Sequence, residues 1–176
     1  LGGDNWRGVD HWEDCGDETL TLDELMRRSE VCVVGVDGGG LDDLFAVAVL
    51  GREKVTRRWL LWTHAWAFQE VFDRRKDIDA KLRDFEEAGD LTICLEVGDD
   101  VTGAIEVIEK LEAKGLLPTE TPAIGLDAAG IAELLDGLDQ AGFGEERWIS
   151  VGQGWKLQSA VLTLPRRLKD RKLIHG

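Results

Sequence analysis

Residues 31–40 read VCVVGVDGGG, an apolar run that ends in Asp37 and passes straight into three glycines. An apolar run of this length bounded by glycine predicts a buried central strand, because an ordinary helix needs about ten residues or more. The carboxylate of Asp37 would then emerge at the end of a rigid element. Gly38, Gly39 and Gly40 remove every Cβ beside it, so a metal ion, a phosphate or another backbone can approach closely. The alternative is that these residues only form a strand-ending turn.

The composition is that of one globular domain, with 176 residues of which 43% are hydrophobic and 32% charged. The sequence contains no apolar stretch of about 18 residues that could span a membrane, and no N-terminal secretory signal. A net charge of −14 argues against a simple nucleic-acid-binding module. It does not argue against an enzyme that holds divalent cations between carboxylates. The cysteines are odd in number and widely spaced, which predicts reduced core residues of a cytoplasmic protein: Cys15, Cys32 and Cys94.

Residues 1–30 are mostly polar and are expected to form a connector that leads into the domain. Within this connector, Thr21 and Glu24 give the Thr-x-x-Glu pattern of a capping box, which predicts a short helix over 22–28. Two isolated tryptophans are either anchors on the domain surface or contacts to a neighbour: Trp6 and Trp12.

Hydrophobic patterning after the connector predicts three strands, over 31–37, 44–51 and 57–67. The links between them are short, so these strands must be antiparallel neighbours, because a parallel crossover needs about a dozen residues or more. Helices and strands then alternate. Helices are expected over 69–88, 99–114, 128–141 and 156–170, and strands over 91–97, 122–127 and 147–154. The predicted fold is therefore α/β and ribonuclease H-like, with a mixed central sheet of three antiparallel strands and parallel additions, flanked by helices.

Two of the predicted strands end in the same way, the first at Asp37 and a later one at Asp127. If the later strand pairs in parallel beside the first, both aspartates lie at the same edge of the sheet. Two carboxylates close together repel each other, and hard divalent cations such as Mg²⁺ or Mn²⁺ relieve the repulsion. Two such metals about 4 Å apart can activate a water and stabilise the leaving oxygen of a phosphodiester. For Asp127 alone the alternative is a helix cap.

Asp43 opens the second strand and could return to the same edge across the hairpin, whereas Asp42 would point to the opposite side. The alternative for both residues is a solvated turn. The histidines have no Cys or His partner at ligand spacing, so each is expected to be structural: His11, His64 and His175. The sequence also lacks a G-x-S-x-G elbow and a GxxxxGK[ST] loop, and DGGG leads into a strand where a dinucleotide-binding turn would open a helix.

Four stretches occur in order: VVGVDGGGLDDLFAVAVLGR, RRWLLWTHAWA, AIGLDAAGIAELLDGL and VGQGWKLQSAVLTLPRRLKDRKLIHG. Together they resemble the C-terminal nuclease domain of the large terminase subunit of tailed phages and prophages, over residues 31–176. The resemblance implies a metal-dependent endodeoxyribonuclease, a hydrolase that cuts concatemeric double-stranded DNA during genome packaging. It implies a two-metal site for Mg²⁺ or Mn²⁺ and a location in the host cytoplasm. The implied partners are an ATPase domain in the same full-length chain, the small terminase subunit and the portal protein.

The family pattern assigns its acids to residues of this sequence. Its first-strand aspartate falls on Asp37, the aspartate of its D-[LF]-x-A step on Asp43, and the acid at the end of the later strand on Asp127. The last acid of the family lies in a helix beyond a Leu-x-His step, here residues 173–175, and the chain ends at Gly176. One metal ligand is therefore expected to be missing, and the isolated fragment is not expected to cut DNA unaided.

The chain begins with Leu1 and its only methionine is Met26, so it is expected to be part of a longer protein. The predicted organisation is a connector over 1–30 and a nuclease domain over 31–176 that is truncated at its C-terminus. Pro165 departs from the family pattern, and we expect it to break or kink the last helix unless it falls in the first turn.

Two other classes of protein remain open. An actin-like or sugar-kinase-like ATPase also follows an aspartate with glycines, but it would need a duplicated domain, and 176 residues hold one copy. A non-catalytic docking module of the packaging motor would carry its acids as surface charge and use its tryptophans to bind a motor or portal protein.

Overall fold

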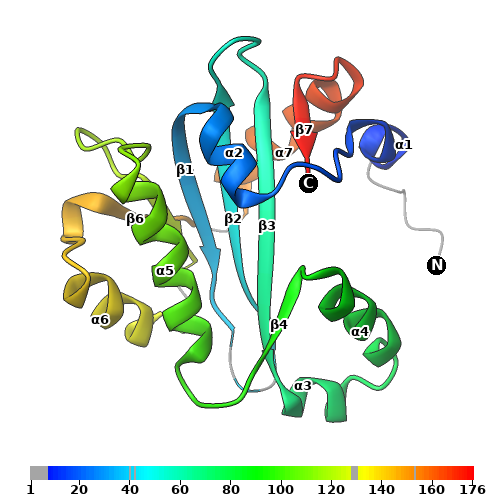
Figure 1. Ribbon diagram of the computed structural model, residues 1–176, viewed down its shortest axis with the longest axis vertical. Helices are drawn as coiled ribbons and strands as arrows, with labels where there is room; N and C mark the ends of the chain where they lie inside the picture. Colours follow the sequence, from blue (N-terminus) through cyan, green and yellow to red (C-terminus); the bar gives the residue numbers. More distant parts are fainter. Residues whose placement is uncertain (1–7, 40, 42, 128–130, 153) are drawn as a thin grey trace.

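The computed structural model describes residues 8–39, 41, 43–127, 131–152 and 154–176. Its centre is a seven-stranded sheet with the order β4-β3-β2-β1-β5-β6, and β7 pairs with β3 outside this path (Figure 1). The strands are β1 Ser29–Asp37, β2 Phe45–Glu53, β3 Trp59–Phe68, β4 Leu91–Cys94, β5 Ile124–Leu126, β6 Trp148–Ser150 and β7 Leu173–His175.

Strands β1, β2 and β3 form the antiparallel meander that the short links predict. Strand β5 pairs in parallel with β1, and β6 in parallel with β5. Both β4 and β7 pair in parallel with β3, at opposite ends of that strand. Every strand except β2 therefore runs in one direction, and the carboxyl ends of β1, β5 and β6 meet at one edge of the sheet. The predicted mixed α/β sheet is confirmed.

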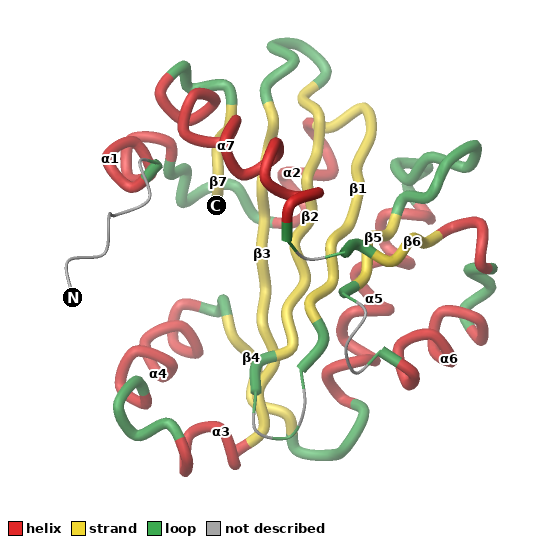
Figure 2. The backbone as a smooth tube through the Cα atoms, turned by 180° about the vertical axis from the view of Figure 1, so that it is seen from behind, coloured by secondary structure: helices red, strands yellow, loops and turns green. Residues whose placement is uncertain are grey.

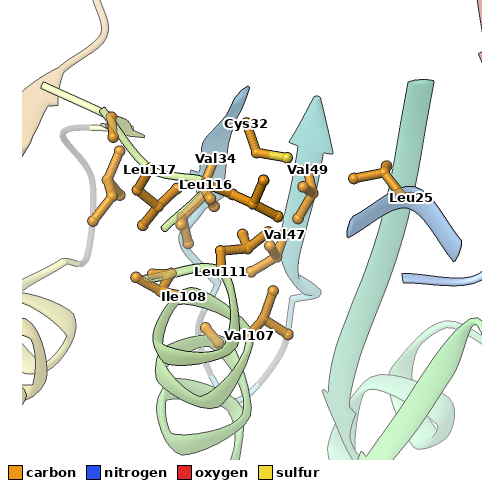
Figure 3. Packing of buried hydrophobic residues seen from close by; sticks show 14 of the residues in the cluster. Leu25, Cys32, Val34, Val47, Val49, Val107, Ile108, Leu111, Leu116 and Leu117 are labelled. Atoms are coloured by element: carbon orange, nitrogen blue, oxygen red, sulfur yellow. The ribbon is translucent and has the colours of Figure 1, made fainter. Parts of the chain in front are cut away.

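One face of the sheet is covered by α2 (Leu22–Arg28), α5 (Asp99–Ala113) and α6 (Ala132–Gln140). Strand β1 supplies Cys32, Val34 and Val36 to this core, while Val33 and Gly35 between them point to the other face. Figure 3 shows the side chains of β1 and β2 meeting those of α5.

The other face of the sheet is covered only at its two ends. At the end of β3 and β4, the helices α3 (Gln69–Arg74) and α4 (Asp79–Ala88) pack on a small apolar cluster around Ala67. At the opposite end, α7 (Trp155–Lys169) packs through Leu168 against Cys15 and Leu173. Figure 2 shows α7 crossing the upper part of this face. Beside it lie α1 (Val9–Trp12) and a 3-10 turn, Glu13–Cys15, and a second 3-10 turn, Glu145–Arg147, precedes β6.

Several element predictions are confirmed. The short helix is present and Thr21 caps it, because the backbone N–H of Glu24 donates to Oγ1 of Thr21 at 3.2 Å and the helix begins at the next residue, Leu22. The reciprocal bond of a capping box is not formed: the Glu24 carboxylate accepts from Arg27, and the backbone N–H of Thr21 donates to the carbonyl of Thr19. The three cysteines are buried and free: Cys15, Cys32 and Cys94. No helix within the described ranges is long and apolar enough to cross a membrane.

Other predictions are wrong in their bounds. The single helix over 69–88 is two helices, because a turn over 75–78 redirects the chain so that Val71, Phe72 and Leu82 all reach one apolar cluster. The strand over 91–97 ends at Cys94, since the side chain of Asp99 accepts the next two backbone N–H groups, at 3.0 and 2.9 Å, and turns the chain into α5.

The C-terminal part also differs from expectation. The strand expected over 147–154 is limited to β6, and of the helix expected over 128–141 the structure has Ala132–Gln140, with residues 128–130 outside the described part. Pro165 lies inside α7 and does not end it. The carbonyl of Val161, which loses its helical donor there, belongs to a residue that is 46% exposed, so water can satisfy it. Strand β7 was not predicted, because its three residues are too few to show a period.

Candidate functional site

Asp37 and Asp127 follow two paired parallel strands at the same position. Val36 of β1 lies opposite Leu126 of β5, and the backbone N–H of Asp127 donates to the carbonyl of Val36 at 3.1 Å. Val36 and Leu126 are buried on the α5 face, so the next residue of each strand points to the opposite face. Both aspartates line one pocket of about 330 Å³ at this edge of the sheet.

Small side chains form the floor of this carboxylate pocket. It is lined by Gly35 and Gly125 on the two parallel strands and by Ala46 and Ala48 on β2, with Thr63 of β3 beside them. A Cβ added to Gly35 would meet no atom within 4 Å, whereas one added to Gly125 would lie 3.0 Å from Cγ2 of Val151. Gly35 is therefore not required by packing, and its missing side chain leaves the pocket open.

At Gly39 the expected close approach is made by another part of the backbone. A Cβ on Gly39 would lie 2.4 Å from the carbonyl oxygen of Leu44, so glycine is required there by the close approach of the hairpin backbone. Gly38 is half-buried, and Gly40 lies outside the described residues. At least one of these glycines therefore serves the turn itself.

Asp43 is exposed and its Oδ1 accepts the backbone N–H of Leu44 at 2.8 Å. Asp43 does not line the carboxylate pocket, although it lies in the loop between β1 and β2, which begins after Asp37. Asp42 lies outside the described residues. The structure therefore brings Asp37 and Asp127 together and leaves Asp43 apart from them, and its role in the site stays a prediction.

The donor set in the carboxylate pocket fits a hard divalent cation. Mg²⁺ is commonly held by one or two carboxylates, with waters and substrate phosphates completing its oxygen shell. Asp37 and Asp127 supply two carboxylates. In the part of the chain that the structure describes, no group of three or more His, Cys, Asp or Glu side chains gathers closely enough to hold a metal. The metal site stays a prediction that rests on two acids.

His64 lies on the opposite face of β3 from the carboxylate pocket. Its Nε2 is 2.9 Å from Oγ1 of Thr92, and its ring stacks on Trp62 and meets Trp66 edge-on. Burial lowers the pKa of His64, although the charge of Asp90 opposes the shift. These contacts hold the ring in place on the sheet, and the structural role of His64 stays a prediction.

His175 joins the two ends of the described chain. Its ring stacks on Trp12 with centroids 3.9 Å apart, and its Nε2 lies 3.0 Å from the carbonyl oxygen of Trp12. The backbone N–H of Asp17 donates to the carbonyl of His175 at 2.7 Å. Sequence reasoning missed this contact, because nothing local relates residues so far apart. Trp6 lies outside the described residues.

The described chain forms a mixed α/β domain, with a central sheet of antiparallel and parallel strands flanked by helices. The fold is similar to that in the crystal structure of the HK97 bacteriophage large terminase, with a TM-score of 0.63 and 21% sequence identity. The similarity covers 88% of this chain and 33% of the terminase chain, so this chain spans about a third of that protein's length. At this identity the likeness establishes the fold. No protein-family model matches the sequence, and no curated protein does.

Proposed function

We propose that this chain is the nuclease domain of a phage-type large terminase, a metal-dependent endonuclease that cuts concatemeric double-stranded DNA during genome packaging. The observation that carries the proposal is the pairing of β1 with β5, which places Asp37 and Asp127 in one pocket. The structural similarity to a large terminase supports the packaging context. The ATPase domain, the small subunit and the portal protein belong to the same proposal as partners.

In this proposal Asp37 and Asp127 hold Mg²⁺ or Mn²⁺ through their carboxylate oxygens, and the bound metal supplies an activated water and charge stabilisation for phosphodiester hydrolysis. The chain's own residues orient the substrate. Gly35 and Ala48 let a phosphate come down to the sheet surface, and the hydroxyl of Thr63 can donate a hydrogen bond to a phosphate oxygen. Asp43, on the adjoining loop, is assigned as a further acid of the site.

The direct test measures Mn²⁺ binding by calorimetry in the chain as it stands. Asp37→Asn and Asp127→Asn should each weaken binding at least about tenfold, because each removes half of the carboxylate charge in the pocket. Asp136→Asn is the matched control, since Asp136 is an exposed aspartate on α6. Unchanged affinity in the Asp37→Asn, Asp127→Asn double variant would exclude the metal site.

Activity is tested in the longer protein of which this chain is proposed to be the nuclease domain. We expect plasmid cleavage that depends on Mn²⁺ and is lost with Asp37→Asn. If that variant cleaves at the rate of the unsubstituted protein, the nuclease proposal is wrong.

The docking-module alternative is favoured by one observation: among the described residues, only two acids line the carboxylate pocket. It predicts that the chain binds a motor or portal protein equally well with and without Asp37→Asn, and that Mn²⁺ does not bind. The nucleotide-binding alternative predicts measurable ATP binding, which the same calorimetry detects.

A further inference from the structure

A second, larger groove of about 840 Å³ lies between α7 and the face of the sheet opposite α5. It meets the carboxylate pocket at Gly35 and Gly125 and extends away from the two aspartates. On the α7 side its wall is formed by Ser159, Ala160, Thr163, Leu164 and Arg167. Val33 of β1 and Ile149 of β6 form part of its floor. We call it the α7 groove.

The α7 groove leaves apolar side chains exposed where a helix layer would be expected. Parallel strands are usually covered by helices on both faces. Here Val33 is 39% exposed and Ile149 is 54% exposed, although both lie on the sheet face. Figure 2 shows α7 crossing β2 and β3 while β5 and β6 lie beside it. A contiguous apolar surface of this kind on a folded protein commonly marks an interaction site.

Arg167 supplies a second, independent observation. It lines the α7 groove, it is half-buried, and its guanidinium lies 5.6 Å from the centre of the Trp59 ring. Arg52 also lies over Trp59, at 5.8 Å, but it has an acidic partner in Glu30 at 3.7 Å. Arg167 takes part in none of the ion pairs formed within the described residues.

In the described part of the chain, the α7 groove is lined by one basic side chain, Arg167, whereas the molecule as a whole has a net charge of −14. The chain carries 35 acidic and 21 basic residues, yet no Asp or Glu is among the described residues that line the groove. A guanidinium held on an aromatic ring keeps its N–H groups available, and a carboxylate accepts two of them in parallel. The groove therefore suits a ligand that combines an apolar face with a carboxylate.

We propose that the α7 groove binds an amphipathic helix of a partner protein, whose apolar face covers Val33 and Ile149 and whose carboxylate pairs with Arg167. A helix is the element that packs on a sheet face, and helix-in-groove recognition uses apolar anchors at positions i, i+3, i+4 and i+7. This inference does not depend on the nuclease proposal, because neither Asp37 nor Asp127 lines the α7 groove.

The test uses two synthetic helical peptides with the same leucine stripe, one with glutamates and one with glutamines along its border. Binding to the 176-residue chain is followed by fluorescence anisotropy. The glutamate peptide should bind about tenfold more tightly, the effect of one charge-assisted pair. Arg167→Gln should remove that preference. Ile149→Asp should weaken both peptides at least about tenfold, because it places a charge under the apolar face.

Val55→Asp is the matched control for Ile149→Asp. Val55 is 89% exposed at the tip of the β2–β3 hairpin, away from the groove, and its replacement should leave both affinities unchanged. Circular dichroism checks that each variant keeps its fold.

Several results would overturn the proposal. Equal affinity of the two peptides for the unsubstituted chain excludes the carboxylate pair with Arg167. Absence of binding by both peptides at millimolar concentration excludes a helix site. If light scattering shows a dimer that Ile149→Asp abolishes, the occupant is a second copy of the chain. If Ile149→Asp instead abolishes binding of duplex DNA, the surface contacts nucleic acid.

Discussion

Gly35 lies in the middle of β1 with room for a side chain, yet it carries none. Glycine within a strand is destabilising by about 0.5–1 kcal/mol relative to alanine, because the unfolded chain gains freedom and no side chain packs. At Gly39 the fold itself requires glycine, since the hairpin backbone leaves no space for a Cβ. At Gly35 the fold has no such requirement. Glycine at this position instead keeps the space above the strand open, and that space is part of the carboxylate pocket.

Gly35→Ala should therefore raise the free energy of unfolding by about 0.5–1 kcal/mol in urea titration. The bulkier Gly35→Val should keep the fold but reduce metal-dependent DNA cleavage by the longer protein at least about tenfold, because its side chain enters the pocket where a phosphate would lie. Both effects follow from the same empty space.

Gly125→Ala is the comparison variant, since its Cβ would lie 3.0 Å from Cγ2 of Val151 and it should therefore gain less stability than Gly35→Ala. A Gly35→Val chain that is folded and fully active would show that nothing approaches the sheet at this point.

For single residues, the sequence predicted the position of a side chain where that residue directly follows a buried strand. The position of Asp37 beside Asp127 depends on strand direction, which short and long connections determine. The position of Asp43 depends on the conformation of a short hairpin loop, in which a single turn residue changes where the carboxylate points. Periodicity carries no information about that.

At the scale of elements, long periodic segments were predictable and short or redirected ones were not. The meander β1 to β3 and the helix α5 have enough residues to show their periods. The sequence over 69–88 shows the apolar pattern of one helix, because the segments before and after the turn over 75–78 both place apolar residues on the same cluster. The pattern therefore does not reveal the turn. The α7 groove was not predictable either, since it depends on which part of the sheet α7 covers.

The helix α2 is joined to the β2–β3 hairpin by an ion pair that sequence patterns do not reveal. Nη2 of Arg28 lies 2.5 Å from Oε1 of Glu53, and the Glu53 side chain is only 10% exposed. Burial by itself would raise the pKa of Glu53, but hydrogen bonds from Thr56 and Arg28 outweigh it and hold that pKa below its ordinary value.

The depressed pKa makes this contact dependent on pH. The folded state holds the ionised Glu53 more strongly than the unfolded chain does, so its contribution is complete above the unfolded pKa of 4.5 and is lost as pH falls through the lower folded pKa. Glu53→Gln should lower the free energy of unfolding by about 1–3 kcal/mol at pH 7, because it weakens a charge-assisted pair.

Urea titrations at several pH values measure the free energy of unfolding of the unsubstituted chain and of Glu53→Gln, and the difference between the two values is followed against pH. That difference should shrink below pH 4.5, the ordinary value for glutamate. A constant difference from pH 7 downward would mean that the ionisation of Glu53 does not stabilise the fold.

At the scale of the whole molecule, the first and last described segments meet. Residues 15–17 lie beside β7, which in turn pairs with β3, and His175 stacks on Trp12. Cys15 is fully buried there, and its Sγ donates a hydrogen bond to the carbonyl of Leu168 at 3.2 Å. The N-terminal segment is thus packed onto the domain through α7 and β7.

Leu173→Ala should open this contact and expose Cys15 to a thiol reagent at pH 7.5, with a loss of about 2–5 kcal/mol in the free energy of unfolding. The other two cysteines should stay unreactive, because burial raises the pKa of Cys32 and of Cys94 to about 11. Labelling followed by peptide mass spectrometry identifies the modified residue.

Leu138→Ala is the control, since Leu138 is as fully buried but lies in the core on the α5 face. If both variants label Cys15 to the same extent, the exposure reflects general destabilisation and not the loss of the local contact.

The contacts between the first and last described segments should form late in folding and open early in unfolding. The hydrogen bond from Cys15 spans 153 residues of sequence, and the contact of His175 with Trp12 spans 163. Contacts across so much chain form only after the loops between them have closed, and peripheral segments open at lower free energy than central strands do. The ends should therefore join last and detach first, while β1, β2 and β5, which position the two aspartates, remain paired. Amide hydrogens near Asp17 should then exchange well before those of Val34 and Val36, so the N-terminal segment can come loose without disturbing the carboxylate pocket.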